Sequence, residues 1–206
     1  MEPTDEALLA AWSSGDHDAA EALMRRHFAS IYRFFRNKLP DEVEEATQRT
    51  FLGCIESASR FRGESSFRGF LFAIARNQLM LALRKRHRSA RVFDPESLSL
   101  NEVDAGSVPS PTGVLAQRQD EQLLLAALRR LPLDFQITVE LFYWEELPIA
   151  DIAVVLDIAA GTVKSRLGRA RQMLREHIEA LAASPGVAAS TLTGFDEWAK
   201  RISDVE

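Results

Sequence analysis

The stretch that most constrains the fold runs from Pro148 to Arg175 and has the pattern of two helices joined by a tight turn. Apolar residues repeat at helical spacing over 149–156 and again over 163–174. Between them, Asp157 stands where the chain must turn, and Asp tolerates the left-handed backbone conformation better than most non-glycine residues. The opposite face of the second helix and its flanks carry polar and basic side chains: Thr162, Lys164, Ser165, Arg166, Arg169 and Arg171. This arrangement predicts a helix-turn-helix, whose second helix enters the major groove of DNA.

An amphipathic helix pair with a solvated basic face would show a similar pattern, because look-alikes of the helix-turn-helix are common. The absence of acidic residues from Ile158 to Arg175 favours DNA binding. The sequence of this segment also favours DNA binding, because it resembles the C-terminal DNA-binding region of bacterial sigma factors. The resemblance lies in GTVKSRLGRARQMLR and in the preceding segments LRRLP and LFYWEELPIADIAVVL. The similarity is to the small extracytoplasmic-function type of the sigma-70 family.

The length and composition are compatible with a protein of this family. With 206 residues, of which 46% are hydrophobic, it can form one large or two small domains. No apolar run approaches the roughly 20 residues that span a bilayer, and the N-terminus has no signal-peptide pattern, so we expect a cytoplasmic protein without membrane insertion. The single cysteine, Cys54, excludes an internal disulfide and a cysteine-rich zinc site. The net charge of −5 does not indicate nucleic-acid binding, but basic and acidic residues are segregated into separate segments.

An acidic helix is predicted from Asp41 to Ala58, with Val43, Thr47 and Ile55 on its inward face. Acidic residues in a first helical turn commonly serve only to stabilise the helix dipole and to keep the surface soluble. The segment also resembles the core-polymerase-binding helix of the family, and the resemblance assigns that role to Glu42, Glu44, Glu45 and Gln48. Arg49 departs from the family pattern, which usually has an acid there. Because it follows Glu45 by four residues, the two side chains are expected to pair along the helix.

The segment from Arg60 to Arg91 combines basic and aromatic residues, with no acidic residue between Glu64 and Asp94. Cations that hold phosphates and aromatic planes that stack on bases are typical of single-stranded DNA binding. Part of the apolar set, such as Leu71 and Leu79, is expected in the core. In the family this segment opens the downstream (minus-ten) promoter element. The resemblance assigns DNA binding and melting to Arg62, Ser65, Phe67, Arg68, Arg76, Asn77 and Arg84. Phe70 stands where the family usually has Trp, whereas Arg76-Asn77 matches the family phrase IARN.

The predicted fold is all-α, with two small helical domains joined by a flexible linker, the C-terminal domain containing the helix-turn-helix. Residues 1–90 form a region-2-like domain for polymerase binding and promoter melting. Residues 91–117 are a linker, acidic and rich in Pro, Ser and Gly. Residues 118–183 form a region-4-like domain that reads the upstream promoter element. Residues 184–206 are a C-terminal extension, in which Leu192, Phe195, Trp198, Ala199 and Ile202 are spaced for one apolar stripe of a short helix.

The resemblance implies a promoter-specificity subunit whose partners are bacterial core RNA polymerase and promoter DNA, with an anti-sigma factor as a possible regulator. It implies no cofactor, metal or catalytic residue. The four histidines are scattered and no phosphate-binding glycine loop or nucleophile motif occurs, so a hydrolytic enzyme is disfavoured. The alternative is a conventional helix-turn-helix repressor or activator that is not a polymerase subunit. Such a protein would not need the acidic helix or the segment from Arg62 to Arg91.

Overall fold

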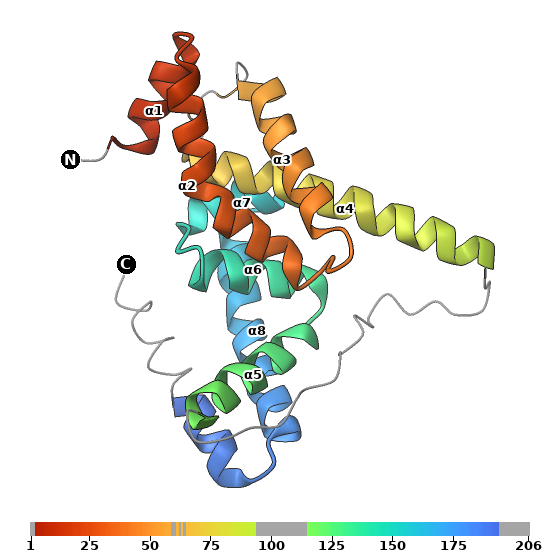
Figure 1. Cartoon of the computed structure of the whole chain (residues 1–206). Helices are drawn as coiled ribbons and strands as arrows, with labels where there is room; N and C mark the ends of the chain where they lie inside the picture. The colour runs from red at the N-terminus through yellow and green to blue at the C-terminus, as the bar shows by residue number, and fades with distance from the viewer. Residues whose placement is uncertain (1–2, 59–60, 62, 64, 94–114, 194–206) are drawn as a thin grey trace. The chain divides into compact units, whose positions relative to one another are not determined.

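A computed structural model describes residues 3–58, 61, 63, 65–93 and 115–193, with side chains described within 3–88 and 122–193 of these ranges. The described part is all-α, as predicted, and contains no strand. Its helices are α1 Asp5–Ser13, α2 His17–Arg36, α3 Val43–Ser57, α4 Phe67–Phe93, α5 Leu115–Arg129, α6 Leu133–Tyr143, α7 Ile149–Leu156 and α8 Ala160–Leu181 (Figure 1). Residues 185–193 are also helical. No helix within the described ranges is both long and apolar enough to cross a membrane.

The first helices begin and end where short polar side chains satisfy backbone groups. Thr4 caps α1 by accepting a hydrogen bond from the Ala7 N–H at 3.2 Å. Asp16 caps α2 by accepting from the N–H groups of Asp18 and Ala19 at 2.9 and 3.1 Å. Between the helices Gly15 has a φ of 98°, a conformation that costs glycine little. Residues 14–16 therefore separate α1 from α2.

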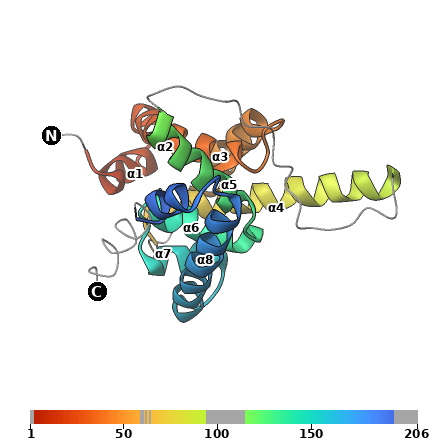
Figure 2. The same ribbon diagram turned by 90° about the horizontal axis from the view of Figure 1, so that it is seen from below.

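The structure divides into two compact units, of which the first comprises Met1–Leu98 and Glu140–Lys164. In this unit α2 packs on α1 and α3, α3 packs on α4, and α4 packs on α7. The core side chains come from several of these helices; among those that are fully buried are Leu23, Ile31, Phe35, Leu71, Phe72, Leu79 and Ile152. The C-terminal half of α4 extends away from the other helices of the unit (Figures 1 and 2). Residues 140–164 thus pack with the N-terminal helices in this unit.

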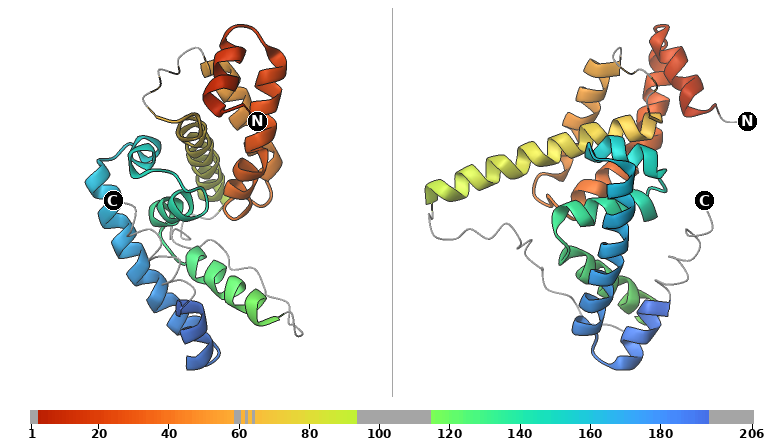
Figure 3. Two further views of the ribbon diagram at one scale, coloured as in Figure 1. Left: turned by 90° about the vertical axis from the view of Figure 1, so that its left-hand side faces the viewer. Right: turned by 180° about the vertical axis from the view of Figure 1, so that it is seen from behind.

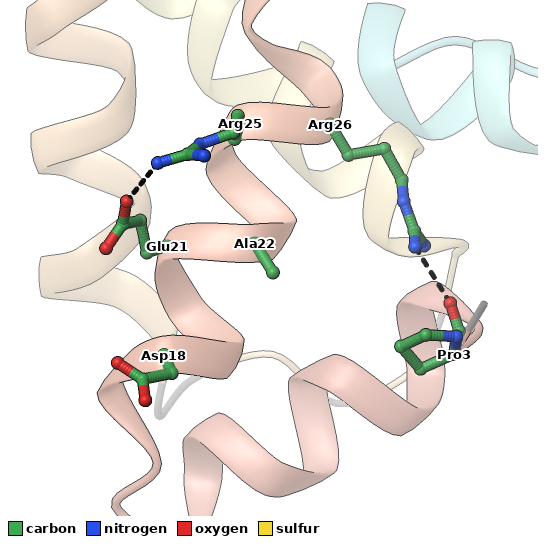
Figure 4. Close-up of a pocket in the computed structure, with 6 residues that line it drawn as sticks. All are labelled: Pro3, Asp18, Glu21, Ala22, Arg25 and Arg26. Atoms are coloured by element: carbon green, nitrogen blue, oxygen red, sulfur yellow. Dashed lines mark hydrogen bonds and ion pairs between the residues drawn. The ribbon is translucent and has the colours of Figure 1, made fainter.

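Arg26 of α2 contacts the residues at and just before the start of α1. Its guanidinium contacts the Asp5 carboxylate at 2.7 Å and donates to the Pro3 carbonyl at 2.9 Å. Arg25 pairs with Glu21 on the same helix, and both side chains line a pocket together with Asp18 and Arg26 (Figure 4). We assign this pocket no ligand.

Helix α3 differs from its prediction in two respects. It begins at Val43, and its N-cap residue Glu42 makes no side-chain capping hydrogen bond. Glu42 instead accepts from Arg86 Nε of α4 at 2.8 Å. The prediction of an inward-facing Ile55 is wrong, because Ile55 is 49% exposed. Val43 and Thr47 are buried as predicted. Cys54 is buried as well, and burial raises the pKa of its thiol to about 12.

The second unit comprises Ser99–Val139 and Ser165–Glu206, and its own core includes Leu128, Ile137, Leu174 and Ile178. The predicted linker 91–117 falls mostly on residues 94–114, outside the described residues, while α4 and α5 take in its two ends. After α8 the chain turns at residues 182–184 and forms a further helix over 185–193, in which Ala188 and Thr191 are buried (Figure 3). Of the predicted apolar stripe, Leu192 is half-buried, and Phe195, Trp198, Ala199 and Ile202 lie outside the described residues.

Candidate nucleic-acid interface

The helix-turn-helix has the predicted turn. Asp157 follows α7 in the left-handed conformation, with φ 55° and ψ 51°. Its backbone N–H donates to the Val154 carbonyl at 3.2 Å, and the Ile158 N–H donates to the Ala153 carbonyl at 3.1 Å. These bonds satisfy carbonyls at the end of α7 that have no partner within the helix. In α8 the predicted inner positions Val163, Leu167, Ala170 and Leu174 are all buried.

The outer face of α8 carries most of the predicted contacts to the upstream element. Thr162, Lys164, Ser165 and Arg169 are exposed, whereas Arg171 is half-buried. The Arg166 side chain is only 22% exposed and lies 3.3 Å from the Asp134 carboxylate, so it must leave this pair to reach a base. Of the arginines on this face, Arg169 is therefore the one whose exposure best fits a contact to guanine or phosphate.

A second group of predicted DNA contacts surrounds the start of α4. We call Ser65, Ser66 and Arg68 the capture loop, because the family resemblance assigns binding of the opened DNA strand to this segment. Arg62 lies outside the described residues. Ser65 and Arg68 are half-buried. Phe67, in contrast, is only 2% exposed and its ring lies 5.6 Å from that of His27. The assignment of Phe67 to a base contact needs correction: its place in the core makes it a support beneath the loop.

Farther along α4, Asn77 and Arg84 are exposed and Arg76 is half-buried. The Arg76 Nε atom is buried, and among the described residues it has no hydrogen-bond partner. A buried donor without a partner carries a free-energy cost, and a ligand that accepts its hydrogen bond removes this cost. A phosphate is an acceptor of the required kind, so Arg76 fits the predicted role.

The acidic face of α3 is a separate surface. Glu44, Glu45 and Gln48 are exposed, and Glu42 is half-buried against Arg86. The expected pair along the helix is present: Arg49 Nη2 lies 2.6 Å from Glu45 Oε1, with both side chains more than half exposed. Arg49 thereby neutralises one of the acids that a basic partner would meet. Exposed apolar side chains of Phe28, Leu52 and Ile55 lie in the groove beside this face.

Three buried acidic residues were missed by the sequence reasoning. Glu140, Glu145 and Asp151 are 3%, 4% and 8% exposed, and all three contact residues of the N-terminal part of the chain. Their sequence context, LFYWEELPIADI, offers one signal, since charges in an otherwise apolar stretch need partners when they are buried. In the described residues no group of three or more His, Cys, Asp or Glu side chains is placed to hold a metal ion.

Two segments of the chain match known protein families. Residues 21–89 match the Sigma-70 region 2 family, and residues 121–174 match the Sigma-70, region 4 family. The ECF RNA polymerase sigma-E factor of Haemophilus influenzae is 30% identical over 187 residues, which cover 86% of this chain and 97% of that protein. The chain belongs to the sigma-70 family of RNA polymerase sigma factors. It is also similar to the ECF RNA polymerase sigma-E factor of Escherichia coli K12, with 24% identity over 86% of this chain and 96% of that protein.

Solved structures support the same fold. CnrH, in complex with the cytosolic domain of CnrY, gives a TM-score of 0.63 at 24% identity over 86% of this chain and 99% of that chain. The sigma factor RpoE of Bartonella quintana, in complex with the anti-sigma factor NepR, gives a TM-score of 0.63 at 24% identity, over 79% of this chain and 98% of that chain. The region 2 match thus covers most of α2, all of α3 and most of α4, with the acidic face and the capture loop. The region 4 match covers α7 and most of α8.

Proposed function

We propose that this chain is a dissociable promoter-specificity subunit, which binds bacterial core RNA polymerase and directs transcription initiation at specific promoters. The observation that carries the proposal is the order of the two sigma regions together with the surfaces they expose. An acidic face on α3 comes first, and a basic recognition face on α8 follows. The chain is a non-enzymatic initiation factor, so the chemistry of RNA synthesis belongs to polymerase. As a polymerase subunit it acts in the cytoplasm.

Three groups of residues divide this work in the proposal. The acids of α3 meet a basic surface of polymerase, and the capture loop with α4 holds the opened downstream strand. The outer face of α8 reads the upstream element in the major groove. The domain ranges predicted from the sequence, 1–90 and 118–183, are proposed for the polymerase-bound chain. Because the structures that it resembles include RpoE bound to an anti-sigma factor, we also propose a regulator of that kind.

The test is transcription in vitro with purified core polymerase, followed by mapping of the start sites. We expect core polymerase to initiate at defined sites only when the chain is added, with two shared sequence elements upstream of each start. Core pulldown should recover the chain in a one-to-one complex. Specific DNA binding without polymerase, and no effect on transcription by core, would favour the conventional repressor or activator instead.

The recognition face of α8 can be tested within the same assay. Arg169→Ala should weaken binding of the holoenzyme to the upstream element by about 1–3 kcal/mol and relax the preference at one base position. Lys164→Ala is the matched comparison, since a phosphate contact would weaken binding evenly across sequences and reduce its salt dependence. If Arg169→Ala changes neither the affinity for the upstream element nor the base preference, α8 does not bind in the major groove as proposed.

A further inference from the structure

We propose that Glu140, Glu145 and Asp151 form an acidic latch that covers the capture loop in the free chain and must be released before a DNA strand is captured. This inference rests on the proposed function. All three carboxylates lie in the first compact unit: Glu140 in α6, Glu145 in the loop that follows it and Asp151 in α7. Each of them contacts a residue of the N-terminal part of the chain. They engage the loop and its surroundings at three separate points.

The first point is Asp151, whose carboxylate accepts hydrogen bonds from both donors of Ser66. The Ser66 N–H lies 3.3 Å from Asp151 Oδ1, and the Ser66 hydroxyl donates to Oδ2. Ser66 stands directly before α4, and its Oγ accepts in turn from the Gly69 N–H at 3.1 Å. Backbone donors at a helix N-terminus favour an anion. The two Ser66 donors that now bind the Asp151 carboxylate could therefore donate equally well to a phosphate of a captured DNA strand.

The second point is Glu145, whose carboxylate is held between two arginines. Arg33 and Arg68 donate to its two oxygens at 3.0 and 3.1 Å. Arg68 is one of the residues assigned to DNA binding, and in this arrangement its guanidinium is committed to a carboxylate of the same chain. A strand that needs Arg68 must first displace Glu145.

The third point is a buried ion pair that fixes the position of the segment. Lys38 pairs with Glu140, and both side chains are almost fully buried. The Lys38 ammonium also donates to the Phe34 carbonyl at 2.7 Å and lies 4.2 Å from the centre of the Phe34 ring. A buried pair of this kind adds little net stability but specifies one arrangement, because either charge alone would be costly to bury.

The fit of the latch also depends on a glycine. A Cβ atom at Gly69 would come within 3.2 Å of Asp151 Cβ and Cγ. The backbone of α4 therefore approaches α7 more closely than any other residue would allow without a shift.

The latch and strand capture exclude one another for two reasons. Carboxylates occupy the donors that would hold phosphates, and their charge repels a strand that approaches the loop.

The relief of the latch is tested by strand binding to the free, full-length chain. The latch variant is Glu145→Gln/Asp151→Asn, and the matched control is Glu56→Gln/Glu146→Gln, which removes two charges from exposed residues of the same unit. The probe is a labelled single-stranded oligonucleotide with the downstream element of a mapped promoter. Replacing charge-assisted hydrogen bonds by neutral ones should open the latch and tighten binding by about tenfold. The control should change affinity by less than about threefold. Equal tightening in both variants, or none in the latch variant, would overturn the proposal.

A covalent lock tests the same contact in the opposite direction. Gly69→Cys/Asp151→Cys places two Cβ atoms 3.2 Å apart, so a small shift of α4 brings them to the Cβ–Cβ distance of a disulfide, and the native Cys54 is buried. Under oxidant the free chain should form the cross-link and lose transcription with core polymerase, and reductant should restore it. Each single-cysteine variant, treated in the same way, is the control. Failure of the cross-link to form, or full transcription by the oxidised double variant, would overturn the latch. Transcription by the untreated wild-type chain tests the proposed function separately.

Discussion

Lys38 illustrates how a single residue can tie distant parts of the sequence together. Burial lowers the pKa of its ammonium, and the nearby Glu140 carboxylate opposes that effect. Lys38→Met leaves Glu140 buried without its counter-charge, which should lower the free energy of unfolding by about 3–5 kcal/mol. Lys38→Met/Glu140→Met removes both charges and should recover most of the loss. Urea denaturation followed by circular dichroism measures both variants.

The exposed pair between Arg25 and Glu21 provides the control for this experiment. The Arg25 side chain is 79% exposed, so Arg25→Met should change stability by less than about 1 kcal/mol. A double variant no more stable than Lys38→Met would show that the two charges do not act as a pair.

His27 should make stability depend on pH. Burial holds its pKa below the ordinary value of 6.5, although Asp5, 2.7 Å from its Nε2, partly opposes the shift. Between the folded pKa and about 6.5 the unfolded chain takes up a proton that the folded chain does not. Acidification from pH 7 through this window should therefore lower the free energy of unfolding. His27→Gln keeps a donor for Asp5 without the titration, and the difference between the two pH profiles isolates the histidine. Parallel profiles would contradict the assignment.

At the scale of single residues, the sequence predicts the conformation of a residue when its neighbours in the chain determine that conformation. Asp157 could be placed in a left-handed turn because the helical periodicities on both sides require one there. Phe67 and Asp151 could not be placed in the same way. An aromatic in a basic segment fits DNA stacking and core packing equally, and only its neighbour His27 decides. An acid on a short apolar helix shows that a partner is needed but not which one.

Among the elements, α3 offers a direct test of polymerase binding. Arg49 pairs with Glu45 on an exposed face, so Arg49→Ala should free this carboxylate and strengthen binding to core polymerase. Reversal of Glu44 and Glu45 to Lys should abolish it. Because the side chains are exposed, both changes should leave stability within about 0.5 kcal/mol. Competition for core polymerase in a pulldown measures the order of affinities.

Arg36→Ala is the matched control, because it removes an exposed arginine from the end of α2. It should leave core binding unchanged. If Arg49→Ala behaves like Arg36→Ala, and the Glu44 and Glu45 reversals still bind, the polymerase surface lies elsewhere.

The ends of the elements were harder to predict than their existence. The sequence Ser184-Pro185-Gly186 is typical of a helix stop, and it follows the end of α8 at Leu181, yet the helix over 185–193 also starts here. Proline suits a first helical turn, and the Ser184 hydroxyl accepts from the Val187 N–H at 3.4 Å. The same three residues are thus compatible with the end of the chain's helical part and with the start of a new helix. The burial of Ala188 and Thr191 shows that a new helix forms and packs here.

At the scale of the whole molecule, the order of the two sigma regions could be predicted, but the packing of residues 140–164 could not. Periodicity shows that α7 has an apolar face without showing what covers it. The partners are separated by 85 residues for Ser66 and Asp151 and by 102 for Lys38 and Glu140. Such pairs leave no local pattern, because each charge by itself resembles a surface residue.

The C-terminal extension now divides into two parts that can be tested separately. A chain ending at Ala183 loses the buried Ala188 and Thr191 and should be less stable by about 1–2 kcal/mol, measured by thermal unfolding. A chain ending at Thr193 keeps these contacts and should melt like the full chain. The predicted stripe of Phe195, Trp198 and Ile202 is absent from both. Because such a stripe needs a surface to lie on, we expect the chain ending at Thr193 to differ from the full chain in promoter output. Equal output from these two equally stable proteins would show that the stripe has no regulatory role.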